Sequence, residues 1–119
     1  MQLVKFLSGY PDLIGRRQAF VGVFQGPASY TAAAGPPLTG GDTLIIPGYE
    51  KYIDSLTEIS IDTSGNYYAV AKPSVAGARA TWTIFYYNAG TSALILNLTG
   101  AGANLPTAQF IVSGFMGEY

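Results

Sequence analysis

The sequence predicts an all-β protein, a single antiparallel β-sandwich or small jelly-roll-like barrel of seven to eight strands. Short runs in which apolar and polar residues alternate recur along the chain at intervals of about ten residues. Glycine, proline, asparagine and serine lie between these runs, as is typical of turns. No stretch shows helical periodicity over a useful length. Strands and turns at this spacing are typical of antiparallel sandwiches and barrels.

The alternation and the turn residues together define the expected strands. They are 1–7, 16–25, 43–47, 53–62, 67–72, 80–88, 93–99 and 108–117. Residues 26–42 are rich in glycine and proline and are expected to form a long irregular loop. The sequence Ser-Gly-Asn at 64–66 predicts a hairpin turn.

The side-chain period of a strand assigns residues to a buried or a solvated face. In 16–25, Phe20 and Phe24 share one face, whereas Val21 and Val23 share the other. The residues expected in the core by this rule are Ile59, Trp82, Ile84, Leu94 and Leu96. Glu58 and Asp62 are expected on a solvated face.

The chain of 119 residues is long enough for one domain with its own core. We therefore expect residues 1–119 to form one β-sandwich domain, with 1–10 as either a short first strand or an extended arm. The N-terminal run does not have the pattern of a signal peptide, because Lys5 interrupts it and no small-residue cleavage site follows.

The sequence lacks the residue types on which most catalysis and zinc binding depend. It contains no histidine and no cysteine. We therefore expect no enzymatic activity, no catalytic or cofactor-binding residues and no metal site. The sequence Asp-Thr-Ser-Gly at 62–65 is similar to the catalytic loop of aspartic proteases, but Ser64 stands where that loop has its glycine. A hairpin turn is the preferred interpretation.

Charge is scarce, and its distribution bears on the partners. Charged residues make up 11% of the chain, against roughly 25% in an ordinary globular domain. The one basic cluster, Arg16-Arg17, is too small for a nucleic-acid interface, so we expect no nucleic-acid partner. The uncharged stretch 80–117 is interrupted by asparagine, proline and glycine, and we expect no membrane partner. Because so few charged groups are available to keep the surface soluble, we expect other subunits to cover part of it.

The nine tyrosines offer a second indication of binding. Tyr67-Tyr68 and Tyr86-Tyr87 are adjacent pairs, so each pair should place one ring inside and one outside. Outward rings suit either a protein interface or stacking on a sugar.

Three segments together resemble the small accessory virion proteins of tailed bacteriophages. They are Gly-Arg-Arg at 15–17, Ser29-Tyr30 followed by Gly-Gly-Asp-Thr-Leu at 40–44, and Gly-Ala-Asn-Leu at 102–105 before the final strand at 110–118. The insert 32–37 departs from the shorter tyrosine-to-glycine spacing associated with such proteins. The resemblance implies a β-sandwich attached to the head or tail, often as a trimer, for example a decoration or cement protein.

The expected function is that of a non-enzymatic virion structural protein, most specifically a capsid decoration protein that stabilises the assembled head. The alternative is a carbohydrate or cell-surface binding module. We expect a homo-oligomer, with three subunits preferred, that binds the major capsid protein or another virion protein. The expected location is the virion, after synthesis in the host cytoplasm. Because apolar chain ends are readily shared with a neighbour, the expected interface residues are Leu3, Phe6, Tyr10, Phe115 and Tyr119. Tyr30 is expected to join them.

Overall fold

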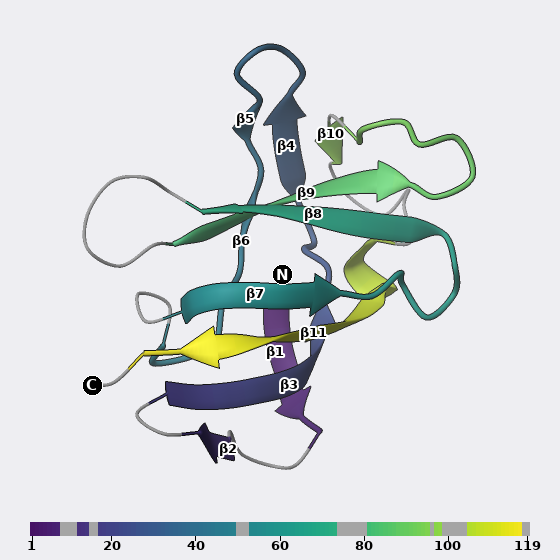
Figure 1. Ribbon diagram of the computed structural model, residues 1–119. Coiled ribbons are helices and arrows are strands. Elements are labelled where there is room, and N and C mark those ends of the chain that lie inside the picture. Colours follow the sequence, from purple (N-terminus) through teal and green to yellow (C-terminus); the bar gives the residue numbers. More distant parts are fainter. Residues whose placement is uncertain are drawn as a thin grey trace.

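The computed structural model describes residues 1–7, 12–14, 17–49, 53–73, 81–95, 97–98 and 105–117. These residues form the predicted all-β fold (Figure 1). In chain order the strands are β1 (Gln2–Phe6), β2 (Asp12–Ile14), β3 (Arg17–Gln25), β4 (Tyr30–Ala33), β5 (Thr39–Gly40), β6 (Asp42–Thr43), β7 (Ile53–Ile59), β8 (Tyr67–Pro73), β9 (Trp82–Asn88), β10 (Asn97–Leu98) and β11 (Gln109–Met116), with one 3-10 turn (Leu105–Thr107) before β11. Six of the eight expected strands are found, as β1, β3, β7, β8, β9 and β11. The expected strands 43–47 and 93–99 correspond only to the two-residue strands β6 and β10, and β2, β4 and β5 were not expected.

The strands are arranged in three antiparallel sheets. The largest has the order β1-β3-β11-β7, with β2 also paired to β3. A second sheet, β6-β9-β8, lies across it, and a small third sheet, β10-β4-β5, extends from one end (Figure 1). Side chains between the two larger sheets form the core. The architecture is therefore that of a small β-sandwich.

Hydrogen bonds link the two larger sheets along one edge. The Leu3 amide donates to the Ile45 carbonyl at 2.9 Å, and the Ile45 amide donates to the Met1 carbonyl at 2.8 Å. Along the opposite edge, β7 and β8 are joined by a turn, and the Trp82 indole donates to the Ile53 carbonyl at 2.9 Å. The sandwich is thus continuous on one side, as in a partly open barrel.

Aromatic rings dominate the centre of the core. Tyr86 is fully buried and packs edge-on against Tyr30, with ring centroids 5.1 Å apart. Its ring also packs against that of Phe110, with centroids 5.7 Å apart. The expected burial of Ile84 is confirmed, whereas Ile59, Trp82 and Leu94 are partly buried residues packed against the core. The side chain of Leu96 lies outside the described residues.

The alternation in β3 is confirmed. Phe20 and Phe24 are buried, whereas Val21 is 42% exposed. Gly22 lies on the buried face, where a Cβ would be 2.8 Å from the Leu3 side chain. A side chain at this position would therefore displace the ends of the Leu3 and Phe24 side chains.

The first residues of the chain form a strand and not an extended arm. Residues 2–6 make up β1, which pairs with β3 from Gln2 opposite Gln25 to Phe6 opposite Gly22. The side chain of Met1 is part of the core. Residues 8–10 lie outside the described part of the chain.

Residues 26–42 were expected to be irregular, and this expectation is wrong for much of the segment. Tyr30–Ala33 and Thr39–Gly40 pair as β4 and β5. Tyr30 and Ala32 are buried, so the strand has the ordinary period of two. Surrounding glycine and proline masked this short alternation in the sequence. Gly40 has φ +75°, and a Cβ there would be 2.5 Å from the Thr31 carbonyl oxygen.

The hairpin turn after β7 is confirmed, but the expectation that Asp62 is solvated is wrong. Asp62 is 2% exposed. Its carboxylate accepts hydrogen bonds from the Ser64 hydroxyl, and from the amides of Ser64 and Gln109 at 3.3 Å each. Gly65 takes the positive φ, +77°, that this turn requires. The carboxylate is buried because it satisfies the amides of the turn and of β11.

Candidate interaction surface

One face of the large sheet points away from the core and carries a group of apolar residues on β3 and β11. The inward residues of β3 and β11 alternate with outward ones, so Val21 and Val23 of β3 and Ile111 and Phe115 of β11 point outward. Val23 lies directly opposite Ile111 in the register of the two strands. Leu7 follows β1 and donates its amide to the Val21 carbonyl at 2.8 Å, which continues the face onto the β1 side.

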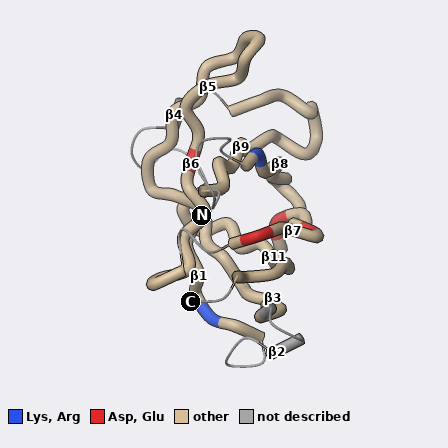
Figure 2. The backbone as a smooth tube through the Cα atoms, turned by 60° about the vertical axis from the view of Figure 1, so that its left-hand side comes forward, with Lys and Arg blue, Asp and Glu red and all other residues tan. Residues whose placement is uncertain are grey.

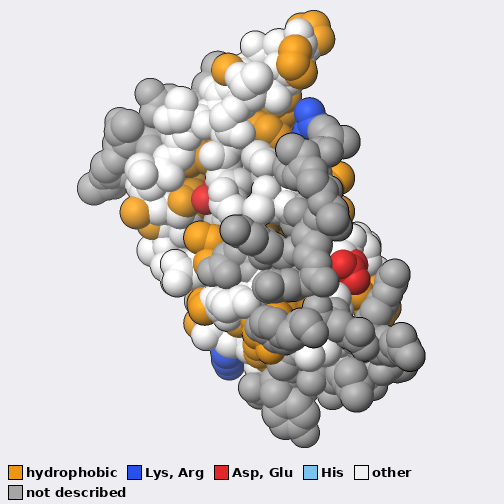
Figure 3. Space-filling model, turned by 90° about the vertical axis from the view of Figure 1, so that its left-hand side faces the viewer, with side chains coloured by type: hydrophobic (Ala, Val, Ile, Leu, Met, Phe, Trp, Pro, Cys, Tyr) orange, Lys and Arg blue, Asp and Glu red, His pale blue; other side chains and the backbone are white. Residues whose placement is uncertain are grey.

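We call Leu7, Val21, Val23, Ile111 and Phe115 the outer apolar face. Its exposed fractions are 54% for Leu7, 42% for Val21 and 40% for Ile111, and Val23 and Phe115 are partly exposed. Val4, 49% exposed, lies beside it at the bulge in β1. Figure 3 shows how sparse charge is on one side of the molecule, where hydrophobic side chains lie among uncharged polar atoms. An apolar set of this kind on neighbouring strands is typical of interaction sites.

Opposite charges lie at the two edges of this face. Lys5 on β1 is opposite Val23 and therefore points outward. Glu58 on β7 is opposite Ser113, and both Lys5 and Glu58 are exposed. Figure 2 shows the acidic positions of β7 in a backbone that otherwise carries little charge.

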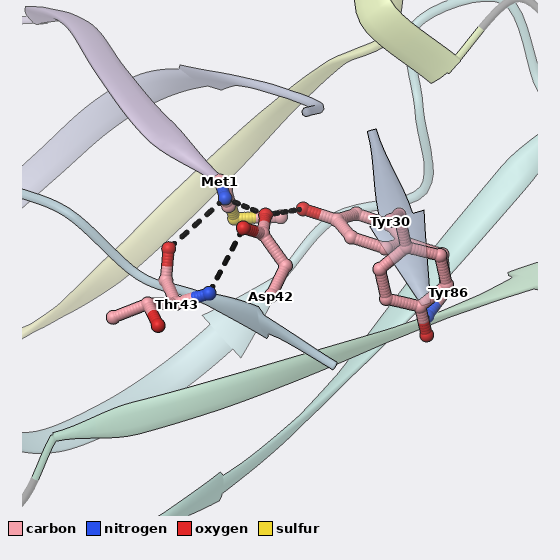
Figure 4. Close-up of polar contacts among 5 residues, drawn as sticks. All are labelled: Met1, Tyr30, Asp42, Thr43 and Tyr86. Atoms are coloured by element: carbon pink, nitrogen blue, oxygen red, sulfur yellow. Dashed lines mark hydrogen bonds and ion pairs between the residues drawn. The ribbon is translucent and has the colours of Figure 1, made fainter. Parts of the chain in front are cut away.

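A polar cluster lies where β6 meets the N-terminus (Figure 4). The Asp42 carboxylate contacts the Met1 amino group and accepts hydrogen bonds from the Thr43 amide at 2.9 Å and the Tyr86 hydroxyl at 2.8 Å. The Met1 amino group also donates to the Thr43 carbonyl at 3.0 Å. The Tyr86 amide donates to the Tyr30 hydroxyl at 3.1 Å. The cluster therefore ties β4, β6 and β9 to the first residue.

Burial shifts the proton affinities in this cluster. It lowers the pKa of the Met1 amino group from 8.0 to about 5, while the adjacent Asp42 carboxylate acts in the opposite direction by favouring the charged amine. Burial also raises the pKa of the Tyr86 hydroxyl. Tyr86 therefore keeps its proton at neutral pH and remains a hydrogen-bond donor to Asp42. These contacts are structural, since each group has a partner inside the fold.

We expect Tyr86→Phe to lower the free energy of unfolding by about 1–3 kcal/mol, because the ring stays in place while Asp42 loses a donor. Urea denaturation measures the change. Tyr87→Phe is the matched control on the same strand, since its ring is partly exposed, and it should change stability by less than about 0.5 kcal/mol. Equal losses in the two variants would contradict the structural role of the Tyr86 hydroxyl.

The expected interface residues are not gathered at one place. Phe115 belongs to the outer apolar face. Leu3 and Phe6 face inward and are partly buried, and Phe6 contacts Phe20 at a ring distance of 6.4 Å. Tyr30 is 3% exposed and packs in the core, so it is not available at the surface of the folded chain. Tyr10 and Tyr119 lie outside the described residues.

Most of the outer apolar face was not predicted from the sequence. The alternation of β3 placed Val21 and Val23 on the face opposite Phe20 and Phe24, and both sets are apolar. Apolar residues on both faces of one strand were the signal that could have predicted this surface. The expectation instead rested on the chain ends.

Two open hollows lie on the described surface. One, of about 640 Å³, is open and lined by the start of β1, residues 25–29 and Asp42. A shallower one of about 240 Å³ lies between β7 and β8 and ends at Trp82. No three acidic residues within the described ranges are grouped to hold a metal ion. Within the same ranges, no helix has the length and apolar character needed to cross a membrane.

Comparison of the chain with family models, with curated proteins and with solved structures finds no match.

Proposed function

We propose that this protein is a non-enzymatic structural subunit of a virion, a capsid decoration protein that stabilises the assembled head. The observation that carries the proposal is the outer apolar face. An isolated subunit would leave Leu7, Val21 and Ile111 about half exposed on adjacent strands. Covering such a face on assembly removes apolar area from water, the main favourable term in protein association.

The chemistry of the chain supports a structural role over a catalytic one. The sequence has no histidine or cysteine. The buried carboxylate of Asp62 is engaged in a turn, and that of Asp42 is engaged by Tyr86 and the Met1 amine. A decoration protein needs neither nucleophile nor general base. It acts by mass action, because a protein that binds the assembled lattice and not its free subunits stabilises the lattice.

Co-sedimentation with assembled capsid shells tests this function. The purified protein should pellet with assembled shells of the phage that encodes it and stay in solution with unassembled capsid subunits. Ile111→Asp and Val21→Asp should each weaken binding to the shells at least tenfold, because each places a carboxylate in the apolar face. Far-UV circular dichroism should show that both variants remain folded, since both side chains already contact solvent.

Val70→Asp is the matched control. Val70 is 47% exposed but lies on β8, in the other sheet. It should bind the shells as the unchanged protein does. Equal loss in all three variants, or no binding by the unchanged protein, would contradict the proposal.

A carbohydrate-binding module is the second candidate, and one observation favours it. Tyr68 and Tyr87 are partly exposed on neighbouring strands, and their rings stack at 5.0 Å with an interplanar angle of 8°. Each ring covers one face of the other, so a sugar would stack on the outward face of the pair. A glycan array separates the two candidates: specific sugar binding lost in Tyr68→Ala would favour the module over the decoration protein.

A further inference from the structure

We propose that the free edge of β8 binds an extended segment of a partner protein. The segment adds one more strand to the second sheet, and it carries a lysine or arginine that faces Glu58. This site lies on the open side of the sandwich, between β7 and β8, and is separate from the outer apolar face. The inference therefore goes beyond the proposed function and does not depend on it.

Strand β8 is the last strand of the second sheet, and its far side pairs with no strand of the described chain. In the order β6-β9-β8, it pairs with β9 from Tyr67 opposite Asn88 to Pro73 opposite Trp82 (Figure 1). Along an antiparallel pair, every second residue directs its backbone N–H and C=O groups away from the neighbouring strand. A strand edge of this kind is a template for another extended chain.

A hydrogen bond at the start of β8 shows which residues direct their backbone groups to the free edge. The Tyr67 carbonyl accepts from the Asp62 amide at 2.9 Å, on the side away from β9. Because the direction alternates along the strand, Ala69 and Ala71 have the same direction as Tyr67. The amides and carbonyls of these two alanines therefore point to the free edge, where no described residue hydrogen-bonds to them.

The hydrogen bonds of β9 support this alternation. Tyr86 lies opposite Ala69, and its carbonyl accepts from the Ile95 amide at 3.0 Å, on the side away from β8. Trp82, four residues earlier, accepts from the Leu44 amide at 2.9 Å in the same way. These residues of β9 direct their backbone groups away from β8, so the residues opposite them on β8 direct theirs away from β9.

The free edge borders the apolar hollow of about 240 Å³ between β7 and β8. Leu56 and Ile59 of β7 line one side of this hollow, and Ala69 and Ala71 of β8 line the other. These four residues and Trp82, which also lines the hollow, pack against the core but are partly exposed. The inward side chains of a strand added to β8 would contact Leu56 and Ile59 and cover this opening, as in strand addition to an exposed sheet edge.

The neighbouring edge strand β7 is a poorer template than β8. Its register with β11 shifts at Thr57 and again at Asp54. Such bulges interrupt the regular alternation of backbone groups and protect an edge from pairing. The register of β8 is unbroken from Tyr67 to Pro73. We therefore infer that the added strand pairs with β8.

Charge indicates what the added strand carries. Glu58 is the one charged residue among the described residues that line the hollow, and it is exposed, whereas Lys72 of β8 does not line it. A lysine or arginine directed inward from the added strand would pass the edge of β7 and meet the Glu58 carboxylate. A second copy pairing through its own β8 would bring the two β7 strands, each with its Glu58, to one interface, and like charges there reduce affinity. The complementary occupant is therefore a basic extended segment of another protein.

Peptide binding tests the site, with Trp82, the single tryptophan of the chain, as the fluorescent reporter. The probes are end-blocked peptides of eight residues that alternate valine with serine and carry lysine, glutamine or glutamate in place of one central valine. The lysine peptide should shift the Trp82 emission to shorter wavelength and bind at least tenfold more tightly than the glutamate peptide, with the glutamine peptide between them. Glu58→Lys should reverse this order, because it exchanges the sign of the charge at the hollow.

Ala71→Pro tests the backbone hydrogen bonds, because it removes an amide from the free edge and leaves the pairing with β9 intact. It should weaken binding of the lysine peptide at least tenfold, while circular dichroism shows that the variant is folded. Val21→Asp, on the outer apolar face, is the control and should bind the peptide as the unchanged protein does. Hydrogen exchange needs no variant: the lysine peptide should slow exchange of the Ala69 and Ala71 amides and leave that of the Val70 amide unchanged.

The inference would be overturned by a lysine peptide that does not bind, by equal affinity for the lysine and glutamate peptides, or by Ala69 and Ala71 amides that are already protected without peptide. A dimer in native mass spectrometry that Ala71→Pro dissociates would also overturn it, because the edge would then belong to a second copy. Peptide binding without binding to capsid shells would overturn the decoration function alone. Binding to shells without peptide binding would overturn this inference alone.

Discussion

Replacing Phe110 with alanine is expected to lower the free energy of unfolding by about 3–5 kcal/mol. Phe110 is fully buried on the inward face of β11, the strand that pairs with both β3 and β7. Its ring packs against Tyr86 at the centre of the core. Truncation leaves a cavity between the two sheets that paired strands on each side prevent from collapsing. The loss is a large share of the stability of an ordinary domain, about 5–15 kcal/mol.

Urea denaturation at a concentration below that of any self-association measures this loss. Val70→Ala is the control, because it truncates an apolar side chain that is 47% exposed. It should change stability by less than about 1 kcal/mol. A loss for Phe110→Ala no larger than that of the control would mean that the inward and outward faces of β11 are exchanged.

Gly114→Ala is expected to have the second largest effect, at or above the upper end of the range of about 1–3 kcal/mol for overpacking. Gly114 lies on β11 opposite Leu56 of β7. A Cβ there would be 2.3 Å from the Ser55 carbonyl oxygen and 3.1 Å from the Leu56 Cα. Both contacts are with backbone, so no side-chain rotation relieves them, and the two strands must separate.

Thermal and urea denaturation measure the effect, and Gly90→Ala is the matched control. No atom lies within 4 Å of a Cβ at Gly90. The control should therefore stay within about 0.5 kcal/mol of the unchanged protein. If Gly114→Ala is equally mild, the close approach of β7 to β11 is not a feature of the fold in solution.

Alternation along the sequence predicted side-chain burial correctly where the residues on one face of a strand are clearly larger or more apolar than those on the other. Phe20 and Phe24 are buried as the period-two pattern predicts, and Tyr67 and Tyr86 are the inward members of their adjacent pairs. Backbone conformation is also local at the hairpin turn, where Gly65 supplies the positive φ. Burial alternation and turn conformation depend on a few neighbouring residues, so they can be predicted from one sequence without a structure.

The pattern failed where distant segments decide the environment. Asp62 is of a residue type that usually lies in solvent-exposed turns. Its carboxylate instead accepts a hydrogen bond from the Gln109 amide of β11 and is buried. Tyr30 was expected at the surface and instead packs on Tyr86, because β4 turns the ring into the core. Neither contact is visible without the pairing of strands far apart in the chain.

The sequence by itself determined the all-β class, the two faces of β3 and the scarcity of charge, because these follow from composition and a period of two. The tertiary structure alone decided which outward residues become neighbours. Val23 and Ile111 are 88 positions apart (111 − 23) yet directly opposed, since β11 inserts between β3 and β7. Lys5 and Glu58 fall at opposite edges of one sheet for the same reason. A surface is a set of residues brought together by strand order, and strand order is set by long-range pairing.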